Sequence, residues 1–309
     1  MNIFKKAIRY IKFIFCFPIE IKQKVDMLVA SNKINETMFY YKYCKDSINY
    51  KEKSKGLIVS LTSYSSRVYD LNFVVLSILN QTVLPEKIII WLDKEYWNND
   101  NIPERLKVLI NNHDILDVKF CKDIKSYKKL IPSLREFSEY NIITVDDDII
   151  YPQDMIELLV KEAKAYPGHA IGHRAHFIKF KNNGDIKCYN HWEYETDKSS
   201  PSSQIFLTSG GGTYFPKGCF YEDVCNEKLF MQYSPTADDV WINVMLQLNN
   251  TPKKKVSDHR KWSERFIEIS NSNDLGLRAL NVGEDKNTHY INNLENKYQI
   301  KLGRGSNNG

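Results

Sequence analysis

Residues 141–152 read NIITVDDDIIYP, and the rest of the fold can be worked out from this stretch. A run rich in β-branched residues leads into three aspartates, Asp146, Asp147 and Asp148, and Pro152 follows shortly after. A short apolar run that stops at turn-forming residues is typical of a strand buried on both faces, as in parallel sheets. Proline is tolerated at the first helical position. The stretch therefore predicts a buried strand, an acidic tip and a helix opened by Pro152.

Similar strands alternate with helical patterns on both sides of this stretch. Predicted strands cover 57–62 (LIVSLT), 87–92 (KIIIWL), 117–120, 169–175 and 205–208. Predicted helices cover 68–80, 103–111, 130–137, the segment from 152 to about 166, and 236–248. Such alternation indicates βαβ units. We therefore expect an α/β fold with a largely parallel central sheet that is flanked by helices on both faces.

Composition narrows the class of protein. The 309 residues suffice for one large domain or two modest ones. With 42% hydrophobic and 26% charged residues, neither a polytopic membrane protein nor a disordered chain is indicated. A net charge of +5 is too small to imply a nucleic-acid partner. The six cysteines form no CxxC pair, which favours reduced thiols and argues against a zinc cluster.

The first 50 residues form a basic segment that differs from the rest. Residues 1–25 carry six Lys or Arg and a single Glu among Ile and Phe, and their longest uncharged apolar run, 13–17, is far shorter than the ~20 residues of a spanning helix. An amphipathic helix here would lie on an anionic membrane surface or pack on the domain. We expect the domain at 51–270, a C-terminal extension and tail at 271–309, and a cytoplasmic protein with possible peripheral attachment to the inner face of the membrane.

The acidic tip is the first candidate site. In open α/β sheets, ligands bind beyond the carboxyl ends of the strands. Three adjacent carboxylates repel one another unless a cation or hydrogen-bond donors compensate them, and their oxygens suit Mg²⁺ or Mn²⁺ together with substrate phosphates. In an extended chain Asp146 and Asp148 share a face, opposite Asp147. The alternative is a solvated acidic turn near the positive end of the following helix.

Two further motifs permit a structural or a functional interpretation. Thr236 and Asp239 have the spacing of a capped helix start, whereas Asp238 or Asp239 could instead act as a general base. The glycines at 210–212 allow either a tight turn or close approach to a ligand. They match neither GxGxxG nor a P-loop, so dinucleotide and P-loop nucleotide binding are not indicated.

His259 is the histidine that we nominate as a third metal ligand, beside Asp146 and Asp148. The competing interpretation is structural, as for most single histidines. A serine-hydrolase triad is not indicated, because the chain has no GxSxG motif.

Seven motifs in order carry a resemblance to a known family. They are VSLTSYSSRV (59–68), SILNQTVLPEKIIIWLD (77–93), DIKSYKKLIPSL (123–134), ITVDDDIIYP (143–152), HRAH (173–176), SGGGTYFP (209–216) and ADDVW (237–241). This set, spread over about residues 56–250, resembles bacterial GT-A-type glycosyltransferases of the family 2 kind, which transfer sugars from nucleotide-diphosphate donors. The resemblance implies a GT-A-like catalytic domain with a DxD motif and a Mn²⁺ or Mg²⁺ cofactor.

The resemblance also implies roles for individual residues. On the donor side the nucleotide would be held by Thr62, Tyr64, Arg67 and Asp93. The diphosphate would be neutralised by Lys128 and Lys129, and the metal would be bound at the Asp146, Asp147 and Asp148 tip, with Asp148 as the direct ligand and Asp146 nearer the ribose or a bound water. On the acceptor side Asp239 would be the catalytic base with Asp238 beside it, and the lining would come from Gly210, Gly211, Gly212 and Trp241.

The predicted function is metal-dependent transfer of a sugar, from a UDP-linked donor, to a saccharide or lipid-linked saccharide acceptor in bacterial surface polysaccharide synthesis. One alternative is a Mg²⁺-dependent phosphohydrolase with an aspartyl nucleophile in the DxD. That nucleophile normally follows the first strand, with Thr or Val where this chain has Ile150, whereas three predicted strands precede the DxD here. The other alternative is a catalytically inactive module that binds sugar nucleotides without consuming them.

Overall fold

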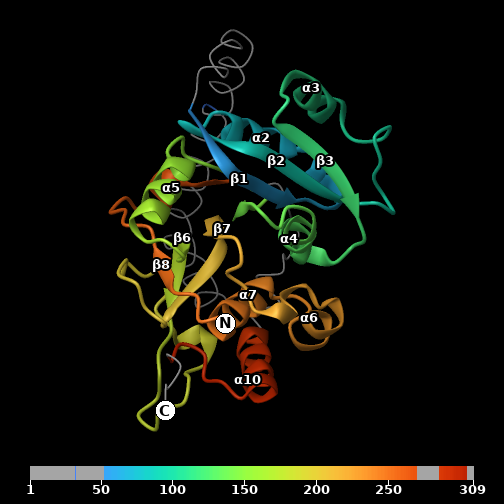
Figure 1. Cartoon of the computed structure of the whole chain (residues 1–309). Coiled ribbons are helices and arrows are strands. Elements are labelled where there is room, and N and C mark those ends of the chain that lie inside the picture. Colours follow the sequence, from blue (N-terminus) through green and yellow to red (C-terminus); the bar gives the residue numbers. More distant parts are fainter. Residues whose placement is uncertain (1–31, 33–51, 270–284, 305–309) are drawn as a thin grey trace, which may run out of the picture.

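A computed structural model describes residue 32, residues 52–269 and residues 285–304 (Figure 1). The predicted membrane-binding segment at 1–25 and nearly all of the basic segment at 1–50 lie outside these residues. Within the described ranges, no helix has both the length and the apolar character needed to cross a membrane.

Seven strands form the central sheet, in the order β3-β2-β1-β4-β7-β6-β8. Their bounds are β1 (Glu52–Thr62), β2 (Val83–Asp93), β3 (Leu116–Cys121), β4 (Asn141–Thr144), β6 (Ala170–Phe177), β7 (Ile205–Phe215) and β8 (Lys253–Lys255). Only β7 runs against the others in this sheet, because it is antiparallel to both of its neighbours, β4 and β6. The predicted α/β class with a largely parallel sheet is therefore confirmed.

Helices cover both faces of the sheet, as the sequence predicts. Leu57, Val59 and Leu61 of β1 join one apolar cluster, together with residues of α2 (Leu71–Leu79), α3 (Glu104–Asn112) and α5 (Met155–Ala165). Ile58 points the other way and joins a second cluster with residues of α7 (Asp238–Leu248), against which Leu134 of α4 (Ile131–Glu136) packs. Alternate residues of a buried strand thus supply both halves of the core.

The C-terminal part of the chain packs on the same body. In Figure 1, α10 (Lys286–Tyr298) lies beside α7 and α6 (Glu227–Tyr233). Ile291 and Leu294 of α10 are fully buried in the cluster that also contains Trp241 and Val244 of α7. Residues 285–304, predicted as part of an extension, therefore share a core with the preceding domain.

Three of the predictions that are wrong about where elements begin or end concern the candidate site. Strand β7 continues from Ile205 through the glycines to Phe215, so residues 210–212 are not a turn. Helix α5 begins at Met155 with Asp154 as its N-cap, rather than at Pro152. Helix α7 begins at Asp238 after Ala237, and the hydroxyl of Thr236 hydrogen-bonds to the hydroxyl of Tyr290 instead of capping the helix.

Candidate functional site

Three consecutive aspartates, Asp146, Asp147 and Asp148, lie beyond the carboxyl end of β4. Strand β4 ends at Thr144, and residues 147–148 form a turn before the short strand β5 (Ile149–Ile150). Because this stretch is a turn, the predicted alternation of the three aspartates is wrong. Arg67 Nη1 lies 3.0 Å from both Asp147 Oδ1 and Asp148 Oδ2, so these neighbours face the same cation.

Asp147 is the buried member of the tip. Its Oδ2 accepts a 2.6 Å hydrogen bond from Ser63 Oγ, directly after β1. Burial raises the pKa of Asp147, although Ser63 and Arg67 oppose this shift. Burial would lower the pKa of Arg67, but the charges of Asp147 and Asp148 raise it. This cluster connects the acidic tip to the end of β1. Asp147 therefore holds the tip in place through Ser63 and Arg67.

Lys129 connects the first aspartate to helix α7. Its buried ammonium lies 2.8 Å from Asp146 Oδ1, 2.8 Å from Ser209 Oγ and 3.1 Å from Asp238 Oδ2. One cation thus joins the end of β4, the middle of β7 and the start of α7. Burial acts to lower the pKa of Lys129, but the carboxylates of Asp146 and Asp238 raise it well above its usual value.

Asp239 has the ionisation expected of a general base. Its Oδ1 accepts a 3.2 Å hydrogen bond from the backbone N–H of Ser209. Burial, with the adjacent charge of Asp238, raises the pKa of Asp239 to about 7, while Lys129 acts in the opposite direction. A carboxylate with a pKa near neutrality can accept a proton in a transition state and release it afterwards.

Asp148 is the aspartate best suited to bind a metal ion. Burial, followed by the charges of Asp146 and Asp147, raises its pKa to about 6. The side chain keeps 37% of its surface exposed, and Asp146 Oδ2 accepts no hydrogen bond from the described residues. These carboxylates suit Mg²⁺ or Mn²⁺, which often take one or two protein carboxylates and complete their shell with phosphate oxygens and water.

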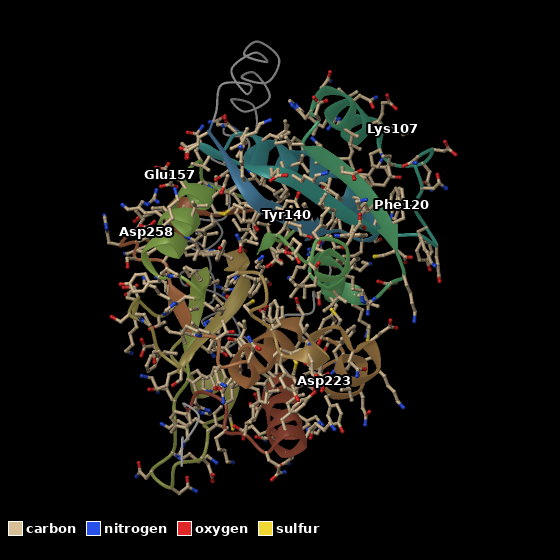
Figure 2. All side chains as sticks on the ribbon, viewed as in Figure 1. Lys107, Phe120, Tyr140, Glu157, Asp223 and Asp258 are labelled. Carbon is tan, nitrogen blue, oxygen red and sulfur yellow. The ribbon has the colours of Figure 1, made fainter. Side chains whose placement is uncertain are left out.

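His259 does not complete a three-ligand site. Its side chain is exposed, and the described residues contain no group of three or more His, Cys, Asp or Glu side chains that could hold a metal ion. Its neighbours form a separate cluster beside α5, where Asp258 is labelled in Figure 2. Asp258 Oδ2 lies 2.7 Å from Arg260 and 3.3 Å from Arg265. The structure thus does not support the nomination of His259 as a metal ligand.

The segment after β8 nevertheless supports the acidic tip, which the sequence did not indicate. Strand β9 (Ile267–Glu268) pairs antiparallel with β5, and the N–H of Ile269 donates a 2.7 Å hydrogen bond to the carbonyl of Asp148. Trp262 of α8 (Trp262–Arg265) stacks on Phe266, with ring centroids 4.2 Å apart. These contacts hold the turn that carries Asp147 and Asp148.

The residues predicted to bind the nucleotide lie at neighbouring strand ends. The hydroxyl of Thr62 donates to the carbonyl of Trp91 at 2.8 Å, and Asp93 Oδ1 accepts from the N–H of Glu95. Tyr64 is 44% exposed, and the centre of its ring lies 5.2 Å from the Arg67 guanidinium. An exposed aromatic ring beside a cation can stack on a nucleobase.

Lys128 departs from the predicted arrangement. Its ammonium forms a 2.6 Å ion pair with Asp123, away from the aspartates of the tip. Lys128 and Lys129 belong to a 3-10 helix, η3 (Lys125–Lys129), in which successive side chains point about 120° apart. Of these two lysines, only Lys129 therefore reaches the acidic tip.

Three residues predicted to line the acceptor side are buried by the protein itself. Trp241 is fully buried in the core, and its Nε1 donates to the carbonyl of Val224 at 3.0 Å. Gly211 faces His173 and Trp262, and Gly212, at φ +88°, faces Met155. The predicted ligand-lining roles of Trp241, Gly211 and Gly212 are therefore wrong, because these residues serve packing.

Replacing Gly211 by alanine is expected to destabilise the protein. The added methyl group would lie 3.0 Å from both His173 Cβ and Trp262 Cζ3, which is too close for a rigid strand interior. Overpacking of this kind costs about 1–3 kcal/mol of unfolding free energy. Gly210→Ala is the matched control, since its methyl group would meet its nearest neighbours at 3.6–3.7 Å. Equal urea-unfolding midpoints for the two variants would contradict this account of the glycines.

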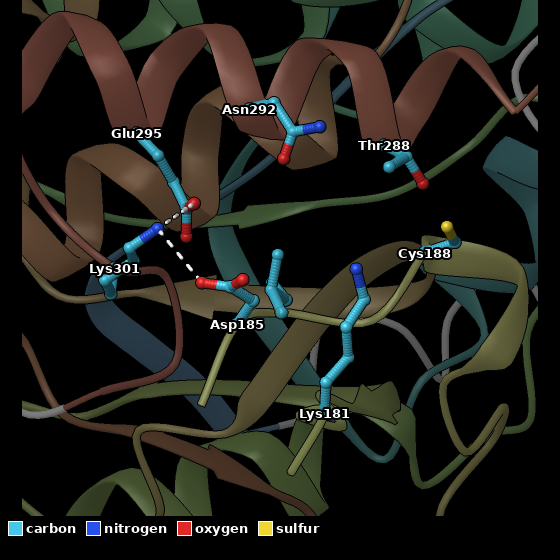
Figure 3. Close-up of a pocket in the computed structure, with 8 residues that line it drawn as sticks. Lys181, Asp185, Cys188, Thr288, Asn292, Glu295 and Lys301 are labelled. Carbon is cyan, nitrogen blue, oxygen red and sulfur yellow. Dashed lines mark ion pairs between the residues drawn. The ribbon is translucent and has the colours of Figure 1, made fainter. Parts of the chain in front are cut away.

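Two cavities lie elsewhere on the molecule. One, of about 260 Å³, lies between α10 and the 181–188 turn, where Lys301 pairs with Asp185 and Glu295 (Figure 3). The other, of about 320 Å³, is lined by Trp91, Cys121, Lys122, Ile124, Pro132, Arg135, Glu136 and Glu227. The aspartates of the tip line neither cavity.

Sequence reasoning missed Ser63 and Ser209 as parts of the site. Each lies inside a motif that was singled out for a neighbouring residue, so position within the motif was the available signal. Comparison with known proteins adds no further assignment. No protein-family model matches the sequence, and no curated protein matches it either.

Proposed function

We propose that the chain is a GT-A-like, metal-dependent glycosyltransferase. It transfers a sugar from a UDP-linked donor to a saccharide or lipid-linked saccharide in bacterial surface polysaccharide synthesis. The observation that carries this proposal is the convergence of two acidic groups on Lys129. The ammonium lies 2.8 Å from Asp146 in the DDD tip and 3.1 Å from Asp238, next to Asp239.

The arrangement offers charged groups that suit the charges developing during sugar transfer. Breaking a sugar-phosphate bond develops positive charge on the sugar, as in glycoside hydrolysis, and negative charge on the departing diphosphate. When bound, Mn²⁺ or Mg²⁺ supplies Lewis-acid stabilisation of that leaving group. Asp148 with Asp146 would hold the ion, and Arg67 and Lys129 place two further cations beside the same tip.

Asp239 would act on the acceptor. The acceptor oxygen forms its bond to the anomeric carbon as the carbon-oxygen bond to the diphosphate breaks, and UDP leaves with the electron pair. The acceptor proton passes to the carboxylate of Asp239, whose orientation is fixed by the N–H of Ser209. Asp238, paired with Lys129, positions the start of the helix that carries this base.

A panel of nucleotide sugars tests the proposal. Ligands that bind only the folded state raise its melting temperature, so UDP and at least one UDP-sugar should stabilise the protein in Mn²⁺ and much less in EDTA. The sugar nucleotide that stabilises it should also release UDP when incubated with saccharide acceptors. Stabilisation by none of the panel would contradict the proposal. Inorganic phosphate released from simple esters would favour a phosphohydrolase, and binding without UDP release would favour an inactive module.

A further inference from the structure

Arg174 of β6 points a free donor group toward the acidic tip. Its Nε and Nη2 donate to Glu195 Oε1 at 3.1 and 2.9 Å, and its guanidinium lies 5.2 Å from the ring centre of Trp262. The side chain is 22% exposed. Carboxylate and ring fix the plane of the guanidinium, while Nη1 donates to no acceptor among the described residues.

Gly210 leaves a space between this donor and the tip. A methyl group at Gly210 would lie 3.7 Å from Arg174 Nη1, 3.7 Å from Asp146 Oδ2 and 3.6 Å from Ile149 Cδ1. The free donor and the free carboxylate oxygen therefore border the same small space. The space is open because residue 210 has no side chain.

The chemistry of the two groups defines what fits between them. An arginine only donates hydrogen bonds, and an ionised aspartate only accepts them. A hydroxyl does both, so it can accept from Arg174 and donate to Asp146. A phosphate oxygen only accepts, and it would be repelled by the aspartate. The carboxylate oxygen carries two lone pairs, so contact with a hydroxyl is compatible with a metal ion at the same tip.

We propose that Arg174 and Asp146, across the space left by Gly210, recognise one hydroxyl of the donor sugar and so determine which sugar is transferred. This inference rests on the proposed function and adds to it. Sites built to hydrogen-bond a hydroxyl strongly reject analogues that lack it or point it elsewhere. Arg174 is thus a specificity residue, and Glu195 is the residue that positions it.

The test compares sugar preference with nucleotide binding. UDP release is measured in Mn²⁺ from UDP-glucose, UDP-galactose and their N-acetyl counterparts, and UDP affinity is measured by calorimetry. Wild-type protein should prefer one donor by about a hundredfold or more in kcat/KM. Arg174→Met and Gly210→Ala should each reduce that preference at least about tenfold, with UDP affinity and melting temperature unchanged. Arg135→Met, which removes an arginine bonded to the carbonyl of Cys225, is the control and should keep the preference.

The outcomes separate this inference from the proposed function. A wild-type protein that uses all four sugars equally, or variants that both keep the full preference, would overturn the role of Arg174 and leave the glycosyltransferase proposal standing. Loss of UDP affinity in both variants would also overturn it, because Arg174 would then serve the nucleotide. Wild-type protein that neither binds UDP nor releases it from any donor would contradict the proposed function, and this inference with it.

Discussion

Replacing Asp239 by asparagine is expected to lower the rate of sugar transfer about a thousandfold, which is the contribution of a well-placed general base. Asparagine cannot take the acceptor proton, but its carbonyl oxygen can still accept the hydrogen bond from the N–H of Ser209. UDP affinity should therefore survive. The measurement is kcat for UDP release with donor and acceptor saturating. The exposed Asp114 supplies the control variant, Asp114→Asn, which should be fully active.

The pH dependence of the same residue gives an independent check. Because the pKa of Asp239 is about 7 and the base must be ionised, wild-type transfer should rise as the pH increases through neutrality. Its pKa is raised above the unfolded value, so the folded protein binds the extra proton between about pH 4 and pH 7 and loses stability as the pH rises through that window. Asp239→Asn should thus melt higher than wild type above neutrality, with little difference near pH 4. Transfer within tenfold of wild type would contradict the assigned role.

Replacing Lys129 by methionine is expected to produce the largest loss of stability. The substitution leaves the carboxylates of Asp146 and Asp238 without their shared cation, and removing one partner of a buried ion pair costs about 3–5 kcal/mol. Urea unfolding would measure the loss. The matched control is Lys128→Met. Lys128 is also buried, but its partner Asp123 is half exposed and regains water when the cation is removed, so this variant should cost about 1 kcal/mol or less. Equal losses in the two variants would contradict the central position of Lys129.

Most of the sheet could be predicted because its signals are local, but β8 was missed, since three consecutive lysines do not resemble a buried strand. The apolar runs of β1, β2 and β4 are buried by both helical layers, so their composition alone marks them as parallel strands. Strand β9 has only two residues and pairs with β5 more than a hundred residues earlier in the chain, so no local pattern could reveal it. The glycines of β7 suggested a turn because glycine is common in turns. What requires glycine here is the close approach of Met155 and His173 to the β7 backbone, and these contacts come from other parts of the chain.

The errors at the site have geometric causes. In ADDVW, Asp239 and Trp241 are two residues apart. In a helix this separation turns the side chains about 200° around the axis, so one faces the site and the other the core. Lys128 and Lys129 diverge for the same reason in a 3-10 helix. The turn at residues 147–148 redirects Asp147 and Asp148 to Arg67, which residue spacing in an assumed extended strand could not predict.

The most direct measurement is calorimetric binding of UDP to wild type and to Asp148→Asn, with Mn²⁺ and with EDTA. The asparagine oxygen can still accept from Arg67, which also holds Asp147, so the variant should keep its melting temperature. Wild type should bind UDP at least about tenfold more tightly in Mn²⁺ than in EDTA, because an ion held by Asp148 would supply positive charge to the diphosphate. In Asp148→Asn that difference should disappear. Equal UDP affinity with and without Mn²⁺ in wild type, or full metal dependence in the variant, would contradict a metal-diphosphate site at this tip.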